Sequence, residues 1–391
     1  MKEGWEYKKL GDICDILNGF AFKSSKYVEK GIRVIRITNV QKGQVEDNDP
    51  KFYPFSSQKE IERYLLYEGD LLVSLTGNVG RVGSLPKELL PAALNQRVAC
   101  LRVKEKHVIR SYLYYFLNSD YFENLCIKHS RGAAQLNLST IWLSNYEIPV
   151  PPLAEQREIV AYLDTAFAKI DAVKANAEQA LNEVKALFQA SLKKMLEPKE
   201  GWEYVKIGNI FNTYSGGTPL KSQKDYYEGG TIPWLRSGEV CAKYITKTGL
   251  FITQKGLDNS SAKYFPSNTV VIAMYGATAA QVGILKLNAT SNQAVCGLLP
   301  NEKYVSEFVY YWFTYKQKEL ASQAQGGAQP NISQIKIRNV LIPAISKVEQ
   351  RTIVATLDAL KSKVDQLQAN CDKITNECAA LKQAILRQVF E

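Results

Sequence analysis

Residues 199–204 read KEGWEY, and the same six letters stand at residues 2–7, an offset of 199 − 2 = 197. The agreement returns at short landmarks along both halves of the chain. The main pairs are Leu10–Ile13 with Ile207–Ile210, Ile35-Arg36 with Leu235-Arg236, Val82-Gly83 with Val282-Gly283, Asn95-Gln96 with Asn292-Gln293, and Glu155–Arg157 with Glu349–Arg351. A period of about 195 residues is far longer than that of solenoid repeats. The chain therefore holds two copies of one domain, each with a following segment; these are copy one and copy two.

The copies diverge widely between the landmarks, although the landmarks themselves agree. A tandem duplication without functional meaning explains the similarity but not this unevenness. Two matched scaffolds that carry different surfaces explain both.

Each copy begins with a β-rich part and ends with a helical part, which predicts an α+β fold. Runs rich in β-branched and other apolar residues, separated by turns, predict strands. Examples are Arg33–Ile37, Asp70–Leu75, Arg97–Val103 and Thr269–Met274. Shorter helices are predicted at residues 108–127 and 303–324, and long ones at about 153–197 and 346–390. The aromatic residues between Tyr112 and Tyr121 are interpreted as packing a helix on the sheet.

Apolar residues recur along both long helices in alternating steps of three and four. They are Leu163, Ala166, Ile170, Val173, Ala177, Ala180, Val184 and Leu187, and then Leu357, Leu360, Val364, Leu367, Cys371, Ile374, Cys378, Leu381 and Ile385. Such sustained seams predict a coiled coil. About 40 residues at 1.5 Å each give a rod of roughly 60 Å. Pairing within the chain, antiparallel, is the first interpretation, and pairing between chains is the alternative.

The composition restricts the function classes. The net charge of +10 supplies what phosphate neutralisation needs, although charge alone does not establish nucleic-acid binding. No apolar run of membrane-spanning length and no signal peptide are found, so we expect a cytoplasmic protein without membrane association. Seven cysteines without a C-x-x-C pair and only two histidines, His107 and His129, argue against disulfide, metal and histidine-based catalytic sites.

The sequence also lacks the motifs of an enzyme. It contains no G-x-x-x-x-G-K-[ST] loop for ATP, no glycine-rich cofactor turn after a strand, and no N-P-P-[YF] signature of adenine methyltransferases. We therefore predict no catalytic residue, no metal site and no cofactor on this chain.

Several short motifs occur in the same order in both copies. They are G-W-x-x-x-x-[LI]-G-[DN]-I at residues 4–13 and 201–210, and P-P-L-A-E-Q-R at 151–157 with S-K-V-E-Q-R at 346–351; the turn S-G-G-T-P stands at 215–219. This order resembles that of the specificity subunits of Type I restriction–modification systems over essentially the whole chain. Copy one departs from the S-G-G-T-P turn, with Asn18-Gly19-Phe20-Ala21-Phe22.

The resemblance implies two target-recognition domains, at residues 1–152 and 199–345, that each read one half of a bipartite asymmetric sequence in double-stranded DNA. A central helix (153–198) and a C-terminal helix (346–391) would form an intramolecular antiparallel coiled coil with pseudo-two-fold symmetry. The chain would dock two methyltransferase subunits and, in the full complex, restriction subunits. S-adenosylmethionine, ATP and Mg²⁺ would bind only to those partners. Partner docking would use the repeated motif residues, which are Glu155, Gln156, Arg157, Glu349, Gln350 and Arg351.

Base reading requires side chains such as Arg for guanine and Asn or Gln for adenine, placed beside turns. The candidates are Arg33, Arg36, Thr38, Asn39, Thr76, Asn78, Arg81, Arg131, Gln135 and Asn137 in copy one, and Arg236, Ser237, Glu239, Tyr275, Thr278, Gln281, Gln329 and Asn331 in copy two. Shared pairs such as Arg36 and Arg236 are interpreted as scaffold or phosphate contacts. Residues that differ at matched places are the better candidates for specificity; these are Asn78 and Arg81 against Thr278 and Gln281.

Two other functions compete with this interpretation. A fused restriction–methylation enzyme conflicts with the missing cofactor motifs and the short chain. A coiled-coil scaffold that does not bind DNA conflicts with the positive charge and the variable polar loops.

Overall fold

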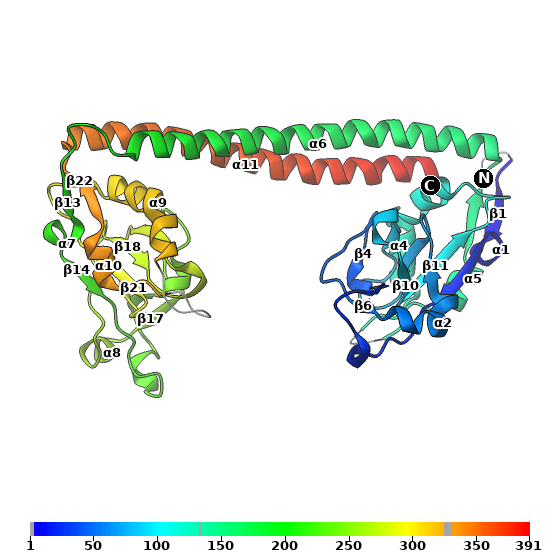
Figure 1. The fold of residues 1–391 in the computed structure, drawn as a ribbon, viewed down its shortest axis with the longest axis horizontal. Helices are drawn as coiled ribbons and strands as arrows, with labels where there is room; N and C mark the ends of the chain where they lie inside the picture. Colours follow the sequence, from blue (N-terminus) through cyan, green and yellow to red (C-terminus); the bar gives the residue numbers. More distant parts are fainter. Residues whose placement is uncertain (1–3, 133–134, 324–330) are drawn as a thin grey trace. The chain divides into compact units, whose positions relative to one another are not determined.

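The computed structural model describes residues 4–132, 135–323 and 331–391. Two compact units divide the chain: unit 1 comprises Met1–Ala177 and Cys371–Glu391, and unit 2 comprises Glu178–Asn370. Each unit therefore contains one β-rich copy and a part of each long helix (Figure 1). The predicted site residue Gln329 lies outside the described residues.

In its described residues, unit 1 is built on two four-stranded sheets and two small ones. The first sheet is antiparallel, in the order β2 (Cys14–Asn18), β11 (Val98–Val103), β8 (Leu71–Ser74) and β9 (Val82–Ser84). The second has the order β6 (Phe52–Tyr53), β3 (Ile32–Ile35), β10 (Ala92–Leu94) and β7 (Leu65–Leu66), with β3 and β10 parallel. The small pairs are β1 (Glu6–Lys9) with β12 (Glu147–Val150), and β4 (Val40–Gln41) with β5 (Gln44–Val45). The helices are α1 (Leu10–Ile13), α2 (Gln58–Ile61), α3 (Arg110–Leu117), α4 (Asp120–His129), α5 (Thr140–Asn145) and the start of α6 (Leu153–Leu196), with 3₁₀ turns at Ser24–Lys26, Ile37–Asn39, Phe55–Ser57, Glu62–Tyr64 and Lys87–Leu89.

Unit 2 repeats this plan. Its main sheet has the order β14 (Thr213–Ser215), β21 (Val295–Leu298), β18 (Val270–Ala273), β19 (Val282–Leu285) and β16 (Tyr244–Ile245). The second sheet has the order β17 (Leu250–Ile252), β15 (Ile232–Leu235) and β20 (Thr290–Ser291), and β13 (Tyr204–Lys206) pairs with β22 (Leu341–Pro343). The helices are α7 (Ile207–Ile210), α8 (Gln254–Asp258), α9 (Ser306–Ser322), α10 (Gln334–Asn339) and the start of α11 (Lys347–Phe390), with 3₁₀ turns at Lys224–Tyr226, Ser237–Glu239 and Gly276–Thr278.

Strand alternation places the main sheet of each unit between two cores. In unit 1, Leu71 and Val73 of β8 face a cluster with helices α3 and α4, whereas Leu72 faces the second sheet. In unit 2, Val270 and Ile272 of β18 likewise pack with α9. A strand buried on both faces reads as a continuous apolar run. The predicted α+β class with its internal repeat is confirmed.

One predicted helix is broken in the structure. The segment 108–127 forms two helices, α3 and α4, because Ser119 ends the first and caps the second: its hydroxyl donates to Phe116 O (2.6 Å) and accepts from Phe122 N–H (3.3 Å). A serine at this position satisfies an otherwise unpaired N–H at the start of a helix. The corresponding α9 of unit 2 is continuous.

The two long helices pair within each unit. In unit 1, Lys382 lies over the Phe167 ring (5.1 Å), and the Cys378 thiol donates to Ile170 O (3.7 Å). From the first contact to the second, the residue number rises on α6 and falls on α11, so the two segments run in opposite directions. In unit 2, Lys185 Nζ donates to Gln368 Oε1 (2.7 Å). The pairing is thus intramolecular, and the segments in unit 1 run antiparallel. A continuous coiled coil stays a prediction.

The predicted seam is only partly buried. Val173, Leu187 and Leu381 are 51–54% exposed, whereas Leu181 and Phe188 are buried in their place. Counting steps of three and four does not separate a pairing seam from a second apolar stripe next to it.

The repeated Val-Gly landmark marks a close approach of a neighbouring backbone segment to a strand. A Cβ atom on Gly83 would lie 2.4 Å from Gln44 O, and one on Gly283 would lie 2.9 Å from Ala242 O. Both distances are too short for a carbon atom, so only glycine fits at this point of β9 and β19.

We expect Gly83→Ala to lower the free energy of unfolding by about 2 kcal/mol or more, since the neighbouring backbone must move. Urea unfolding followed by circular dichroism measures this effect. Gly238→Ala is the matched control, because nothing lies within 4 Å of its ideal Cβ position. Equal stability of the two variants would contradict the close-approach argument.

Candidate nucleic-acid interface

In unit 1, loops that are distant in sequence meet where β3, β8 and β10 end. Asn95 N–H donates to Ile35 O (3.1 Å), and Leu75 N–H donates to Arg97 O (3.0 Å). Leu138 N–H reaches Leu75 O (2.8 Å), so the segment after α4 joins the same group. The structure thus brings the candidates at residues 76–81 and 131–137 together, beside the end of β3, where the candidates at residues 33–39 lie.

The centre of this group is a contact between Thr76 and Asn137. The Thr76 hydroxyl donates to Asn137 Oδ1 (3.0 Å), and Asn137 exchanges two backbone hydrogen bonds with Arg131 (2.8 and 3.0 Å). Around it, Asn78, Arg131 and Gln135 are exposed. Hence Thr76 and Asn137 hold the loops together, while the three exposed side chains are free to meet a ligand.

Unit 2 builds the same arrangement with other side chains. Tyr275 and Asn331 form the matching bridge, and Ile332 N–H donates to Met274 O (2.8 Å). Tyr275 and Asn331 are exposed, and Thr278 is partly exposed. Gln281 is partly exposed, with a buried Oε1 that has no hydrogen-bond partner among the described residues.

The candidate residues at 33–39 of copy one are largely engaged in internal contacts. Arg33 binds Asp47 (2.7 Å), and Arg36 donates to Asp49 O (2.5 Å). Asn39 is 3% exposed; its amide donates to Glu46 O and Asn48 O and accepts from Arg36 N–H. These contacts give the stretch a structural role, and only Thr38 within it is exposed.

The matched turn of copy two has the same geometry. Arg236 N–H donates to Glu239 Oε2 (2.9 Å), as Arg36 N–H donates to Asn39 Oδ1 (2.9 Å). Glu239 also accepts from Gly249 N–H, and Ser237 starts the short 3₁₀ turn. The shared arginines therefore begin matched turns, which agrees with their interpretation as scaffold.

Arg81 differs from its counterpart Gln281 in what it contacts. Its guanidinium donates to Gln41 Oε1 (2.6 Å), which links the loop after β8 to the β4–β5 hairpin. The predicted specificity role of this matched pair stays a prediction.

Sequence reasoning treated two pairs, Asn95-Gln96 and Asn292-Gln293, as landmarks but not as site residues. In the structure they lie within the loop groups, and Thr218 donates to Gln293 Oε1. Repetition of an Asn-Gln pair directly after a strand was the signal that could have identified them.

The repeated E-Q-R motif proves to contain a structural clamp. Gln156 is fully buried; its amide accepts from Ile109 N–H (2.7 Å) and donates to His107 O and Pro151 O. Gln350 repeats all three bonds with Val305, Lys303 and Ile345. Because neither side chain reaches the surface, we reassign both glutamines from partner docking to attachment of the β-rich copy to its helix.

The neighbouring glutamates make a matched contact of their own. Trp5 Nε1–H donates to Glu155 Oε1 (2.9 Å), and Trp202 Nε1–H donates to Glu349 Oε1 (3.2 Å). This bond explains why G-W-E-Y and E-Q-R recur together. Of the six residues predicted to dock partners, the two arginines are exposed; they are Arg157 and Arg351.

A tyrosine–aspartate pair reinforces the same junction in each unit. The Tyr115 hydroxyl donates to Asp164 on α6, and the Tyr311 hydroxyl donates to Asp358 on α11. Burial, together with the aspartate, raises the pKa of both tyrosines. The hydroxyls therefore stay protonated donors.

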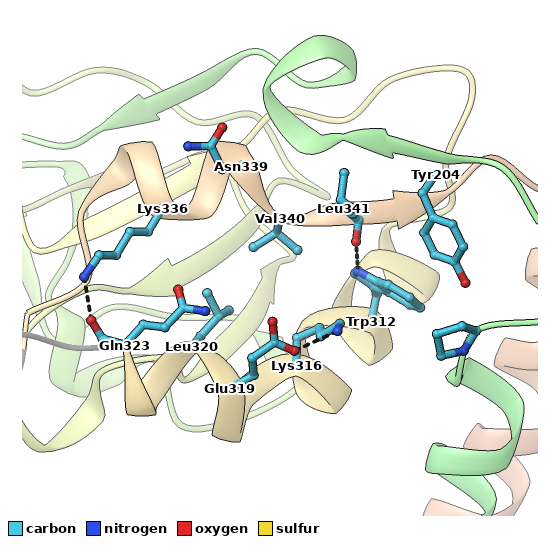
Figure 2. A pocket seen from close by; sticks show the side chains of 11 residues that line it. Tyr204, Trp312, Lys316, Glu319, Leu320, Gln323, Lys336, Asn339, Val340 and Leu341 are labelled. Carbon is cyan, nitrogen blue, oxygen red and sulfur yellow. Dashed lines mark hydrogen bonds and ion pairs between the residues drawn. The ribbon is translucent and has the colours of Figure 1, made fainter.

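A cavity of about 530 Å³ lies beside α9, α10 and β22 (Figure 2). Three of its polar lining groups are bonded: Trp312 Nε1–H to Leu341 O (2.8 Å), Lys316 to Glu319 (2.7 Å) and Lys336 to Gln323 O (2.5 Å). The buried Tyr204 hydroxyl of the lining has no hydrogen-bond partner among the described residues. No predicted DNA-binding residue lines it. The cavity is thus outside the candidate interface.

No group of metal-ligating side chains is found in residues 4–132, 135–323 and 331–391. Burial raises the pKa of the Cys14 and Cys296 thiols to about 12, so neither is a nucleophile near neutral pH. None of the helices described is long and apolar enough to cross a membrane.

The family described as Type I restriction modification DNA specificity domain matches residues 2–183 and 199–376. The specificity subunit of the Type I restriction enzyme EcoBI from Escherichia coli is 26% identical over 424 residues, covering 99% of this chain and 86% of that protein. The EcoR124I/EcoR124II specificity subunit, also from Escherichia coli, is 28% identical over 270 residues, covering 65% of this chain and 64% of that protein.

Two solved structures share the fold. A chain from a study of complex assembly and conformational transition of the Type I R-M system has a TM-score of 0.75 at 21% identity, covering 100% of this chain and 98% of that chain. The HsdS subunit from Thermoanaerobacter tengcongensis has a TM-score of 0.56 at 20% identity, covering 100% and 97%. Since the family match extends over both copies, this chain belongs to the Type I restriction–modification DNA specificity family.

Proposed function

We propose that the chain reads a bipartite, asymmetric sequence in double-stranded DNA, with one half-site for each copy. The observation that carries this proposal is the loop group that both units build with the same backbone contacts and different exposed side chains. Asn78 and Arg131 belong to the group of unit 1, whereas Tyr275 and Thr278 belong to that of unit 2. Rigid turns that present polar groups suit readout of base edges.

The specificity subunit has no catalytic role of its own; methylation and cleavage belong to partner subunits. S-adenosylmethionine, ATP and Mg²⁺ are proposed to bind only to those partners. The proposed partners are two methyltransferase subunits, joined by restriction subunits in the full complex.

Exposed apolar side chains at equivalent positions of the two copies support a partner protein that binds once to each copy. Leu187 is 54% exposed and Leu381, 194 positions later, is 51% exposed. Ile141 (74%) and Ile335 (69%) form a second pair with the same offset. Exposed apolar groups at equivalent places suit two identical protein partners, one on each copy. The exposed Arg157 and Arg351 stay proposed docking residues.

Replacing residues 1–150 with the corresponding segment of another specificity subunit should change one half-site and leave the other unchanged, because the two loop groups lie in separate compact units. Methylome sequencing of a strain that carries the hybrid measures both half-sites. The reciprocal replacement in copy two is the control and should change the other half.

A change in both half-sites would show that the reader is composite. Absence of sequence-specific methylation from the strain with the unaltered chain and its methyltransferase partner would contradict the proposed function and favour a scaffold without DNA reading.

A further inference from the structure

Copy two contains a basic cavity within its loop group. The cavity has a volume of about 550 Å³, and its lining includes Lys221, Lys224, Trp234, Arg236, Asn292 and Gln293. Trp234 is 4% exposed, and its Nε1–H donates to Gly217 O (2.9 Å), so the ring is a fixed wall. We call this the Trp234 cavity.

The charges of the Trp234 cavity are unbalanced. Lys221, Lys224 and Arg236 are cationic, and Glu228 is the carboxylate of the lining, which leaves an excess of 3 − 1 = +2. Arg236 is paired with Glu239 (3.4 Å). Within the described part of the chain, Lys221 and Lys224 have no ion-pair partner, and both are exposed.

Copy one has a different sequence at the positions equivalent to this part of the cavity. Where copy two has Gly217-Thr218-Pro219, copy one has Phe20-Ala21-Phe22. Phe20 packs against Tyr64 (5.2 Å between centroids) and Phe22 against Tyr53 (4.9 Å), so aromatic rings occupy this region.

One of the lysines beside these rings in copy one, Lys26, is engaged. Lys26 pairs with Glu60 (3.5 Å) and lies 5.8 Å from the centroid of the Tyr53 ring. Lys23 of copy one is exposed and has no ion-pair partner among the described residues, so the two copies differ in the cavity beside the lysines and not in the presence of unpaired ammonium groups.

We propose that Lys221 and Lys224 anchor backbone phosphates of the DNA duplex in the half-site of copy two. The inference rests on the proposed function and adds a contact at the Trp234 cavity of copy two. An unpaired ammonium is a point charge suited to phosphate, and phosphate contacts fix the register of a protein on DNA without reading sequence. Anchored there, the duplex would face the Asn292-Gln293 turn on the wall of the same cavity.

The test compares the full chain with its Lys221→Ala/Lys224→Ala variant. Fluorescence anisotropy measures binding to two labelled duplexes at several salt concentrations. One duplex has a random sequence, and the other contains the target sequence that methylome sequencing identifies. Each phosphate contact contributes about 0.9 to the slope of log K against log salt concentration. On both duplexes, the slope of the variant should thus be smaller in magnitude by about 1.8. Its preference for the target sequence over the random sequence should be unchanged.

Lys104→Ala/Lys373→Ala is the matched control. It removes the same charge from exposed lysines that are paired with Asp15 and Glu377, and it should leave the slope nearly unchanged. An equal loss of slope in the control would show a general charge effect and overturn the anchoring role. An unchanged slope in the test variant would also overturn it, while DNA binding by the wild-type chain would keep the proposed function intact. Failure of the wild-type chain to bind either duplex would contradict both.

Discussion

Replacing Gln350 with alanine is expected to lower the free energy of unfolding of unit 2 by about 2–4 kcal/mol, because one buried donor or acceptor left unpaired costs about 1–3 kcal/mol. The substitution removes the partner of Val305 N–H and of two carbonyl oxygens, those of Lys303 and Ile345. The side chain is 0% exposed, so water does not replace it without a rearrangement. Urea unfolding of the full chain, followed by circular dichroism, measures the loss.

Arg351→Ala is the control, since its side chain is exposed and next in sequence. It should change the free energy of unfolding by less than about 0.5 kcal/mol and act only on partner binding. Gln156→Ala should destabilise unit 1 by a similar amount, because the same three bonds are made there. Wild-type stability of the Gln350→Ala variant would contradict the clamp.

The Gln350→Glu variant separates hydrogen bonding from packing. A glutamate has nearly the same shape, but its carboxylate would face two carbonyl oxygens, which disfavours the charged form and raises its pKa above the unfolded value. A carboxyl group with a raised pKa stabilises the fold at low pH, and this contribution is lost as pH rises through the folded pKa. We therefore expect Gln350→Glu to regain stability relative to wild type as the pH falls, which Gln350→Ala should not do.

Much of the architecture could be predicted because its signals are local. Buried strands such as β8 and β18 are continuous apolar runs, and both long helices lack glycine and proline between their first and last turns. The break at Ser119 escaped this reasoning, because a capping serine and a serine inside a helix have the same appearance in sequence.

The site was less predictable because its geometry depends on pairing between distant segments. Thr76 meets Asn137 across 61 positions, and nothing local to either residue shows this contact. Repetition itself misled the assignment of Gln156 and Gln350. A residue kept in both copies is required twice, but the repeat does not say whether a partner or the chain's own backbone requires it.

Deleting one heptad from each long helix, Val173–Gln179 from α6 and Cys371–Glu377 from α11, is expected to abolish methylation of the original target. The segments lie between two observed contacts, Ile170 with Cys378 and Lys185 with Gln368, and both contacts are retained. A whole heptad also preserves the apolar register. The chain passes from unit 1 to unit 2 within α6 and returns within α11, so the helices carry the connection between the units.

The size of the effect follows from helix geometry. Seven residues shorten each helix by about 10 Å, and DNA rises about 3.4 Å per base pair, so the gap between half-sites would shrink by about three base pairs. Three base pairs also turn the duplex by about 100°, given about 10.5 base pairs per turn, whereas a heptad turns the helix pair by only about 20°. The variant should thus either methylate the same half-sites at a changed gap or lose activity with its fold intact.

Methylome sequencing gives the gap, and circular dichroism shows that the helices remain folded. The control keeps the length of both helices and replaces only exposed residues within the same segments, and it should methylate the original target. An active deletion variant that retains the original gap would show that the long helices do not set the spacing. In that case their exposed matched leucines, Leu187 and Leu381, would serve only to bind partner subunits.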